Sequence, residues 1–196
     1  LTTYCFAQSP IGWGIDESNR VPVGLKIGTK APDLKSLDVN GKEVSLQKLT
    51  QKGNVVLLFF RGQWCPVCNR YLSNFQDSVQ QILDKGASVI AVTPETSDNA
   101  KTMISKTGMT FTVVSDIDEK IMKSYDVLFD VTDDYQNKII NNLDNDIAEN
   151  NGKEKARLPV PATYIINKKG DIISVFFDYN YKKRASVSEI VAVLEK

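Results

Sequence analysis

The sequence predicts an α/β fold, in which strands and helices alternate along the chain and build a sheet flanked by helices. Two apolar runs, 54–60 and 87–93, have the length and composition of strands that are buried on both faces of a sheet. Between them, apolar residues recur at helical spacing after Cys65, and the pattern stops at Gly86. Buried strands separated by a helix are typical of parallel pairing, so we expect these two strands to be parallel neighbours.

Length and composition limit the possible classes of protein. A chain of 196 residues favours one domain with additions over two full domains. Its 42 % hydrophobic and 24 % charged residues are ordinary for a globular protein. Lys plus Arg and Asp plus Glu number 24 each, so no broad basic field exists to attract nucleic acid or anionic lipid. No apolar run approaches the length of a membrane span, so we expect neither nucleic-acid binding nor an integral membrane segment.

The amino-terminal residues resemble the end of a secretory signal, with cleavage after Ala7. On this interpretation residues 1–7 are a signal-peptide remnant, and the mature protein is exported, in the periplasm or an equivalent space. The alternative is a leader without address information on a cytoplasmic protein. The rest of 1–27 is rich in Gly, Pro and polar residues, which predicts an extended arm lying over the domain formed by 28–196.

The elements of that domain can be taken in order. An Asn-Gly pair inside 37–46 lies between short alternating segments and predicts a β-hairpin. After the two buried strands, we expect a helix over about 97–107 that closes at Gly108 and then a strand over 110–114. A brief helix over 116–125 should turn four apolar residues inward, namely Ile117, Ile121, Met122 and Tyr125.

The region from about 126 to 157 departs from this alternation and predicts a helical insertion. Its apolar stripe consists of Tyr135, Ile139, Ile140, Leu143 and Ile147. The charged run 153–157 is interpreted as solvated surface, with an interaction surface as the alternative. The strands 162–167 and 171–177 flank a Lys-Lys-Gly turn and so form an antiparallel hairpin. A capping box over 186–189 then begins a final amphipathic helix.

The chemistry is concentrated in Cys65-Pro66-Val67-Cys68, directly after the first buried strand. Proline suits the first position of a helix, which makes Pro66 that residue and Cys65 the N-cap. The Cys65 sulfur then lies beside free N–H groups and the positive end of the helix dipole, which favour a thiolate and lower a thiol pKa from about 8.5. Residues three apart share a helix face, so the two sulfurs can meet in a disulfide. We expect Cys65 to attack and Cys68 to resolve.

Other interpretations of the two cysteines are weaker. A zinc site needs four ligands, but the chain has no histidine, and its only other cysteine is Cys5. Asn69 stands where a haem-attachment motif requires histidine. A purely structural disulfide stays open, although it would close too small a loop to restrain the unfolded chain much. We expect no metal and no cofactor beyond the redox-active cysteine pair.

The order of these segments resembles the thioredoxin fold, and within it the peroxiredoxin-like branch of the alkyl-hydroperoxide-reductase/thiol-specific-antioxidant (AhpC/TSA) family. The resemblance extends from about residue 28 to the carboxyl terminus, and its most specific segment is Phe60-Arg61-Gly62-Gln63-Trp64-Cys65-Pro66-Val67-Cys68-Asn69. Further similar segments are 28–33, 40–42, 158–163 and 177–184. The family implies a central mixed β-sheet flanked by helices, to which this chain would add an N-terminal β-hairpin extension and the helical insertion.

The resemblance also implies an activity. It implies a thiol-based oxidoreductase that cycles Cys65 and Cys68 between dithiol and disulfide, reduces peroxides or disulfides, and is re-reduced by a thioredoxin-type dithiol partner. Pro161 should be a cis proline facing the sulfurs, which would leave the Val160 backbone free to pair with an incoming peptide. Trp64 would shield the other side of the turn, and Pro66 would influence the stability of the thiolate.

Three departures from the family pattern leave alternatives open. In a gapless alignment with a peroxiredoxin, Cys68 falls at the position of the peroxide-attacking cysteine, and Pro161 replaces an arginine. Arg61 could supply the missing positive charge, or it could be an ordinary surface arginine. Phe59 occupies the place of thioredoxin's buried acid, which leaves water or the neighbourhood of Glu95 as proton acceptor. The alternative function is a non-catalytic binding module with a structural Cys65–Cys68 bridge.

Overall fold

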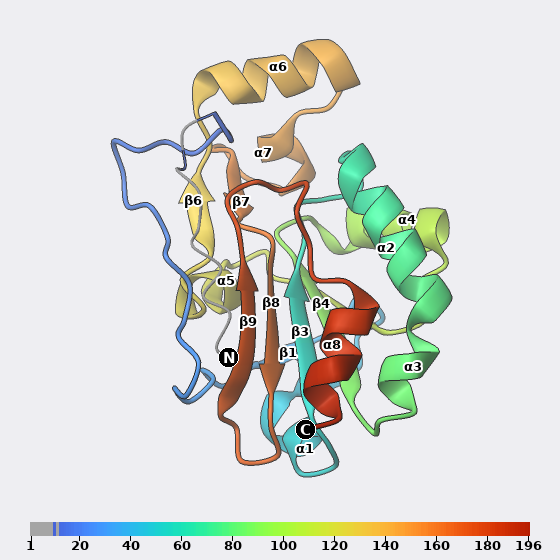
Figure 1. Cartoon of the computed structure of the whole chain (residues 1–196). Helices are drawn as coiled ribbons and strands as arrows, with labels where there is room; N and C mark the ends of the chain where they lie inside the picture. The colour runs from blue at the N-terminus through green and yellow to red at the C-terminus, as the bar shows by residue number, and fades with distance from the viewer. Residues whose placement is uncertain (1–9, 11) are drawn as a thin grey trace.

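A computed structural model describes residue 10 and residues 12–196 of the chain (Figure 1). The predicted signal-peptide remnant, residues 1–7, lies outside the described residues. The centre of the structure is a five-stranded sheet in the order β5-β4-β3-β8-β9. These strands are β3 (Val55–Phe59), β4 (Ser88–Thr93), β5 (Thr112–Ser115), β8 (Ala162–Ile166) and β9 (Ile172–Phe177).

The sheet is mixed, as the sequence predicts. Strand β3 pairs in parallel with β4, and β4 with β5, whereas β8 pairs antiparallel with both β3 and β9. Every residue of β3 and of β8 is buried. Helices on both faces can shield such strands from water, which explains their continuous apolar composition. The expected thioredoxin-like α/β sheet is therefore confirmed.

The helices begin and end largely where capping residues predict. They are α1 (Leu46–Thr50), α2 (Pro66–Ser78), α3 (Gln80–Leu83), α4 (Ser97–Thr107), α5 (Lys120–Ser124) and α8 (Val187–Leu194). Gly108 ends α4 with a left-handed φ of 69°, and Ser186 and Glu189 form the predicted capping box of α8. Helix α8 lies next to α3 and covers one face of the sheet (Figure 1). No helix in the described part of the chain is long and apolar enough to cross a membrane.

Helix α5 begins later than the sequence predicts. The expected helix over 116–125 is shortened because the Asp116 carboxylate accepts hydrogen bonds from the N–H groups of Ile121 (3.1 Å) and Met122 (2.8 Å). These are the free donors of the first helical turn, so the chain before Lys120 stays outside the helix. The prediction that Ile117 points inward is wrong, because its side chain is 44 % exposed.

The predicted N-terminal hairpin is present, and the insertion holds more than one helix. Strands β1 (Lys35–Leu37) and β2 (Glu43–Ser45) pair antiparallel. In the insertion, β6 (Leu128–Asp130) pairs with β7 (Arg157–Pro159), and α6 (Asp133–Leu143) and α7 (Ile147–Asn150) lie between them. The chain turns between the two helices because Asp144 adopts a left-handed φ of 50° and the Asp146 side chain caps α7.

The insertion lies beyond one end of the central sheet. Figure 1 shows α6 past the carboxyl end of β3, which is the end where α2 begins. The amino-terminal arm reaches the same region, since Ile15 forms a β-bridge with Val131 and the Thr132 N–H donates to the Gly14 carbonyl at 3.0 Å. The arm and the insertion therefore enclose the end of the sheet at which the two cysteines lie.

One backbone contact provides a test of the fold. Gly53, before β3, approaches the turn before β4 so closely that a Cβ atom would lie 1.9 Å from the Gly86 carbonyl oxygen. We expect Gly53→Ala to lower the free energy of unfolding by about 1–3 kcal/mol, as overpacking does. Urea denaturation checks this, with Lys52→Ala at the adjacent exposed position as the control. An unchanged midpoint for Gly53→Ala would contradict the close approach of the two turns.

Candidate active site

The two cysteines lie where β3 ends and α2 begins. Cys65 is the N-cap of α2 and Pro66 is its first residue, as predicted. The Cys65 sulfur accepts a hydrogen bond from the Cys68 N–H at 3.3 Å. Both cysteines are free thiols and both are buried. The pair therefore has the helix-terminal geometry that the motif predicts, in its reduced form.

The turn before α2 is fixed by two neighbouring polar side chains. The Asn69 side-chain amide donates to the carbonyl oxygens of Gln63 (2.8 Å) and Cys65 (2.9 Å). The Gln63 N–H donates to Glu95 Oε2 at 2.8 Å. A Cβ atom at Gly62 would lie 2.6 Å from Glu95 Oε1, so only glycine lets the carboxyl group approach the turn this closely. The backbone that presents Cys65 is consequently held in one conformation.

Arg61 is a buried cation in contact with the first sulfur. It is 3 % exposed, and its Nη2 donates to Cys65 Sγ at 3.1 Å while its Nη1 donates to the Tyr135 hydroxyl at 2.6 Å. The guanidinium carbon also lies 3.5 Å from the centre of the Tyr181 ring. Among the ion pairs of the described residues, none joins Arg61 to a carboxylate.

The cysteine sulfurs compensate the buried positive charge of Arg61. Burial lowers the pKa of Arg61, but the negative charges of Cys65 and Cys68 raise it by a larger amount. The resulting pKa lies above the ordinary value. A buried charge is costly unless an opposite charge compensates it. The compensating anion at this site is a thiolate of the cysteine pair. Arg61 is thus not the ordinary surface arginine that the sequence left as an alternative.

A second arginine contacts the other sulfur. Arg184, just before α8, places Nη2 at 3.5 Å from Cys68 Sγ, and its Nε donates to the Tyr181 carbonyl at 2.9 Å. Each sulfur of the pair therefore has one guanidinium beside it. The two guanidiniums come from distant parts of the chain, and both are stabilised by a thiolate.

The charges around the pair favour a thiolate on Cys68, whereas the sequence predicts one on Cys65. Burial raises the pKa of Cys65, and the neighbouring Cys68 raises it further, against the effect of Arg61. Burial also raises the pKa of Cys68, but hydrogen bonding with Cys65 and the charges of Arg184 and Arg61 bring it well below the usual value. A single thiolate shared by the pair is therefore favoured at Cys68 by the charges of Arg184 and Arg61.

Glu95 is a buried acid beside this pair, at the end of β4. Burial raises the pKa of its carboxyl group to about 8; the Gln63 N–H opposes that rise and the charge of Cys68 adds to it. Its Oε1 has no hydrogen-bond partner among the described residues, and neither has the nearby Trp64 Nε1. Near neutral pH the carboxyl group is therefore protonated, and it can give or take a proton during thiol chemistry.

The expectations for Val160 and Pro161 are not met. The described residues contain no cis peptide bond, so the peptide bond before Pro161 is trans. Val160 is 1 % exposed, and its N–H donates to the Val127 carbonyl at 2.7 Å. The backbone that the resemblance assigned to an incoming peptide is therefore already bonded to the insertion. Trp64 is buried at 4 % exposure, whereas Pro66 is exposed.

Several residues of the site carry no signal that identifies them in the sequence. Tyr135 was assigned to the apolar stripe of the insertion, yet its hydroxyl accepts from Arg61. Asn69 and Tyr181 belong to no recognisable pattern in the sequence. Their roles come from the contact of Asn69 with Gln63 and of Tyr181 with Arg61. Arg184 lies inside a segment that resembles the family, but only the structure brings it to Cys68.

Comparison with known proteins identifies a family. The model of the AhpC/TSA family matches residues 27–175. The thiol-disulfide oxidoreductase ResA of Bacillus anthracis is 32 % identical over 104 residues, which cover 53 % of this chain and 59 % of that protein. Peroxiredoxin Q of Triticum aestivum is 24 % identical over 168 residues, which cover 86 % of this chain and 66 % of that protein. The matched part of the chain thus spans less than two thirds of the length of either relative.

Solved structures are similar in fold. The peroxidoxin BcpB of Mycobacterium tuberculosis superposes with a TM-score of 0.68 at 17 % identity, covering 87 % of this chain and 97 % of that one. A peroxiredoxin-like protein of Aquifex aeolicus gives a TM-score of 0.67 at 19 % identity, covering 89 % of each chain. At these identities the comparison supports the fold alone.

The buried acid allows a test by pH. The folded-state pKa of Glu95, about 8, lies above the ordinary value of 4.5, so its contribution to stability is complete below about pH 4.5 and is lost as pH rises through about 8. Glu95→Gln keeps an acceptor for the Gln63 N–H but cannot ionise. We expect its stability relative to the wild type to rise by a few kcal/mol between pH 5 and pH 9, on the order set by such a pKa shift.

Chemical denaturation across this pH range provides the measurement. Glu154→Gln, at an exposed position, is the matched control and should follow the wild type at every pH. Parallel pH profiles for Glu95→Gln and the wild type would show that Glu95 is not a neutral buried acid.

Proposed function

Because this chain belongs to the AhpC/TSA family, we propose that it is a thiol-dependent oxidoreductase that reduces hydroperoxides through a dithiol–disulfide cycle of Cys65 and Cys68. A thioredoxin-type dithiol protein then re-reduces the disulfide. The observation that carries the proposal is the contact of two guanidinium groups with the two sulfurs. Arg61 is buried and has no carboxylate partner within the described part of the chain. A thiolate is the anion that such a site stabilises, and thiolates are the reactive form of cysteine.

The burial of both sulfurs supports a small oxidant. Cys65 and Cys68 are each 0 % exposed. A hydroperoxide needs only a small movement of the covering side chains to reach a sulfur, whereas a protein disulfide must bring its own sulfur into the site. The position of Cys68 in the gapless alignment, where peroxiredoxins have the attacking cysteine, supports the same assignment. Arginine N–H groups beside the sulfurs can also donate hydrogen bonds to the peroxide oxygens.

The proposed reaction has two steps. The Cys68 thiolate attacks one peroxide oxygen, the O–O bond breaks, and the leaving alkoxide takes the proton of Glu95, which gives an alcohol and a Cys68 sulfenic acid. The Cys65 sulfur then attacks the sulfenic sulfur. An S–S bond forms, and hydroxide leaves with the Cys65 proton as water. The partner dithiol returns two electrons and two protons, which restore the Cys65 thiol, the Cys68 thiolate and the protonated Glu95.

Reduction of protein disulfides is the second candidate. The 32 % identity to a thiol-disulfide oxidoreductase over 104 residues favours it, as does the close spacing of the two cysteines on one helix. In that reaction the same thiolate would attack a disulfide sulfur and form a mixed disulfide. The exported location stays a prediction from residues 1–7, and the non-catalytic binding module stays the alternative that an inactive cysteine pair would favour.

Single-cysteine variants distinguish the roles of the two thiols. We expect both Cys65→Ser and Cys68→Ser to abolish turnover with a dithiol reductant, because neither can close the disulfide. In a single exposure to hydrogen peroxide, Cys65→Ser should still form a sulfenic acid at Cys68, whereas Cys68→Ser should react at least about tenfold more slowly, since burial still raises the pKa of its remaining thiol. Mass spectrometry with a sulfenic-acid trap measures both reactions.

The same assay decides between the two substrates. Reduced wild type is mixed with hydrogen peroxide and, separately, with an oxidised protein substrate, and the rate of Cys65–Cys68 bridge formation is compared. Faster reaction with the protein disulfide would replace the peroxidase assignment with the second candidate. No reaction with either oxidant, or unaltered turnover in both single-cysteine variants, would end the assignment to this cysteine pair.

A further inference from the structure

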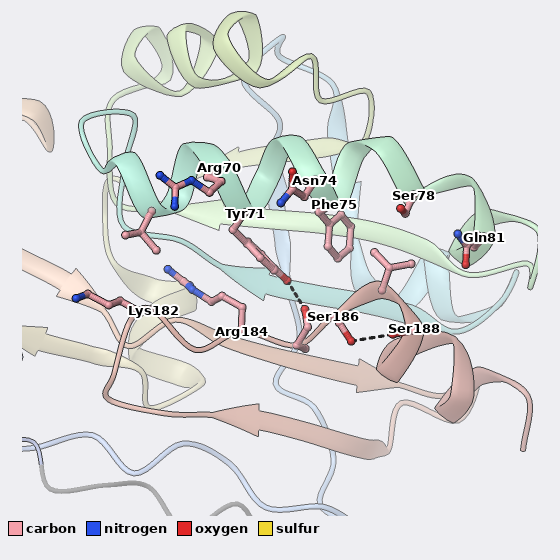
Figure 2. A pocket seen from close by; sticks show the side chains of 13 residues that line it. Arg70, Tyr71, Asn74, Phe75, Ser78, Gln81, Lys182, Arg184, Ser186 and Ser188 are labelled. Carbon is pink, nitrogen blue, oxygen red and sulfur yellow. Dashed lines mark hydrogen bonds between the residues drawn. The ribbon is translucent and has the colours of Figure 1, made fainter.

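We propose that the groove between α2 and the start of α8 binds an extended acidic peptide segment, carried by the dithiol protein that re-reduces the Cys65–Cys68 disulfide. The inference rests on the proposed function and specifies the class of partner. Figure 2 shows the groove, with α2 along one side and the segment before α8 along the other. Its volume is about 840 Å³.

The dimensions of the groove suit an extended peptide. On one side, its lining runs from Val67 in α2 to Gln81 in α3. At a rise of about 1.5 Å per residue this is a length of roughly 20 Å. An extended peptide rises about 3.3 Å per residue, so about six residues would occupy that length. The lining residues Arg70, Asn74 and Gln81 are exposed to solvent, and a segment of a folded partner requires such access.

The lining of the groove combines apolar and neutral polar side chains. Its apolar residues, which can receive peptide side chains, are Val67, Tyr71, Phe75, Ala185 and Val187. Its neutral polar side chains, which can hydrogen-bond a peptide backbone, are Asn74, Ser78, Gln81, Ser186 and Ser188. An apolar surface with interspersed donors and acceptors is typical of sites that bind peptides.

The charged residues of the lining are all cationic. Arg70, Lys182 and Arg184 lie together at one end of the groove (Figure 2), and no Asp or Glu is among the described residues that line it. Arg70 and Lys182 are exposed and have no ion-pair partner among the described residues. Charge complementarity therefore favours an occupant that is acidic at this end.

Arg184 connects this end of the groove to the cysteine pair. It lines the groove, and its Nη2 lies 3.5 Å from Cys68 Sγ. In the reduced protein the guanidinium is beside a thiolate. When the disulfide forms, Cys68 loses its negative charge and Arg184 loses that partner. A carboxylate of the peptide can then bind Arg184 and draw it away from the sulfur, so the oxidised protein should bind the acidic segment more tightly than the reduced protein.

The exchange itself follows ordinary thiol chemistry. A thiolate of the bound partner attacks Cys68, the Cys65–Cys68 bond breaks, and a mixed disulfide forms between the partner and Cys68. The second thiol of the partner attacks its own bonded sulfur and releases the Cys68 thiolate. Two electrons and two protons pass from the partner, which leaves as a disulfide. The cationic end of the groove would position the partner's cysteines next to Cys68.

Two synthetic peptide dithiols of equal length test the inference, one with glutamates around its cysteine pair and the other with lysines. The protein is first oxidised with a chemical disulfide-forming reagent, so that the test does not depend on its reaction with peroxide. We expect the glutamate peptide to reduce the oxidised wild type about tenfold faster than the lysine peptide at low ionic strength, and the ratio to fall as salt is added.

Charge-reversal variants locate the effect. In the double variant Arg70→Glu, Lys182→Glu the ratio of the two rates should fall to about one or below, whereas Lys52→Glu, at an exposed position away from the groove, should keep the wild-type ratio. Because both peptides are measured with the same variant, a general loss of reactivity lowers both rates equally and leaves their ratio unchanged. An unchanged ratio in the double variant would overturn the inference, as would equal rates of the two peptides with the wild type.

Two further outcomes distinguish a small thiol from an extended segment, and failure of the proposed function from failure of the groove assignment. If a small anionic tripeptide thiol reacts as fast as the glutamate peptide and loses its rate equally in the double variant, the groove binds a small thiol and the proposal of an extended segment is wrong. If the oxidised protein selects the glutamate peptide but the reduced protein reacts with no oxidant, the proposed function fails while the groove assignment stands.

Discussion

The contact between the Arg61 guanidinium and the Cys65 sulfur is the interaction on which the rest of the site depends. A buried cation must have an anion nearby, and within the described residues this one has no carboxylate. The cysteine pair supplies the negative charge, so the arginine and the thiolate stabilise each other. The same guanidinium donates to the Tyr135 hydroxyl, which ties the insertion to the active turn. Redox chemistry at the sulfurs and the position of the insertion are therefore linked through one side chain.

The site combines groups that stabilise a thiolate with restricted access. Arg184 adds a second positive charge at Cys68, and Glu95 provides a neutral acid near physiological pH. These groups act strongly on the sulfurs because burial excludes water and its screening. The same burial closes the site to large molecules in the reduced form. A protein with this arrangement can react with a small oxidant inside the site, but must rearrange a covering side chain before it exchanges disulfides with another protein.

Arg184 is the side chain that the proposed peroxide reaction and the proposed partner recognition have in common. It stabilises the thiolate in the reduced protein and borders the cationic end of the groove between α2 and α8. Oxidation removes its anionic neighbour, so one charge can serve first in catalysis and then in recognition of the reductant. On the proposed function, Arg184 therefore connects the groove to the cysteine pair, although the groove lining includes neither cysteine.

The sequence by itself determined the mixed sheet, the helix-terminal positions of Cys65 and Pro66, and the resemblance to the family. These features depend on local information, namely apolar runs, capping residues and the spacing of two cysteines along one helix. Local patterns also placed the thiolate on Cys65, whereas the surrounding charges favour Cys68, and they wrongly turned Ile117 inward. The cis form of Pro161, which the family resemblance implied, was wrong as well. Only the tertiary structure decided which charges surround the sulfurs, because Tyr135, Tyr181 and Arg184 reach the pair from segments distant in the chain. Burial and long-range charge set a thiol pKa, and neither can be obtained from the residues next to the cysteine in sequence.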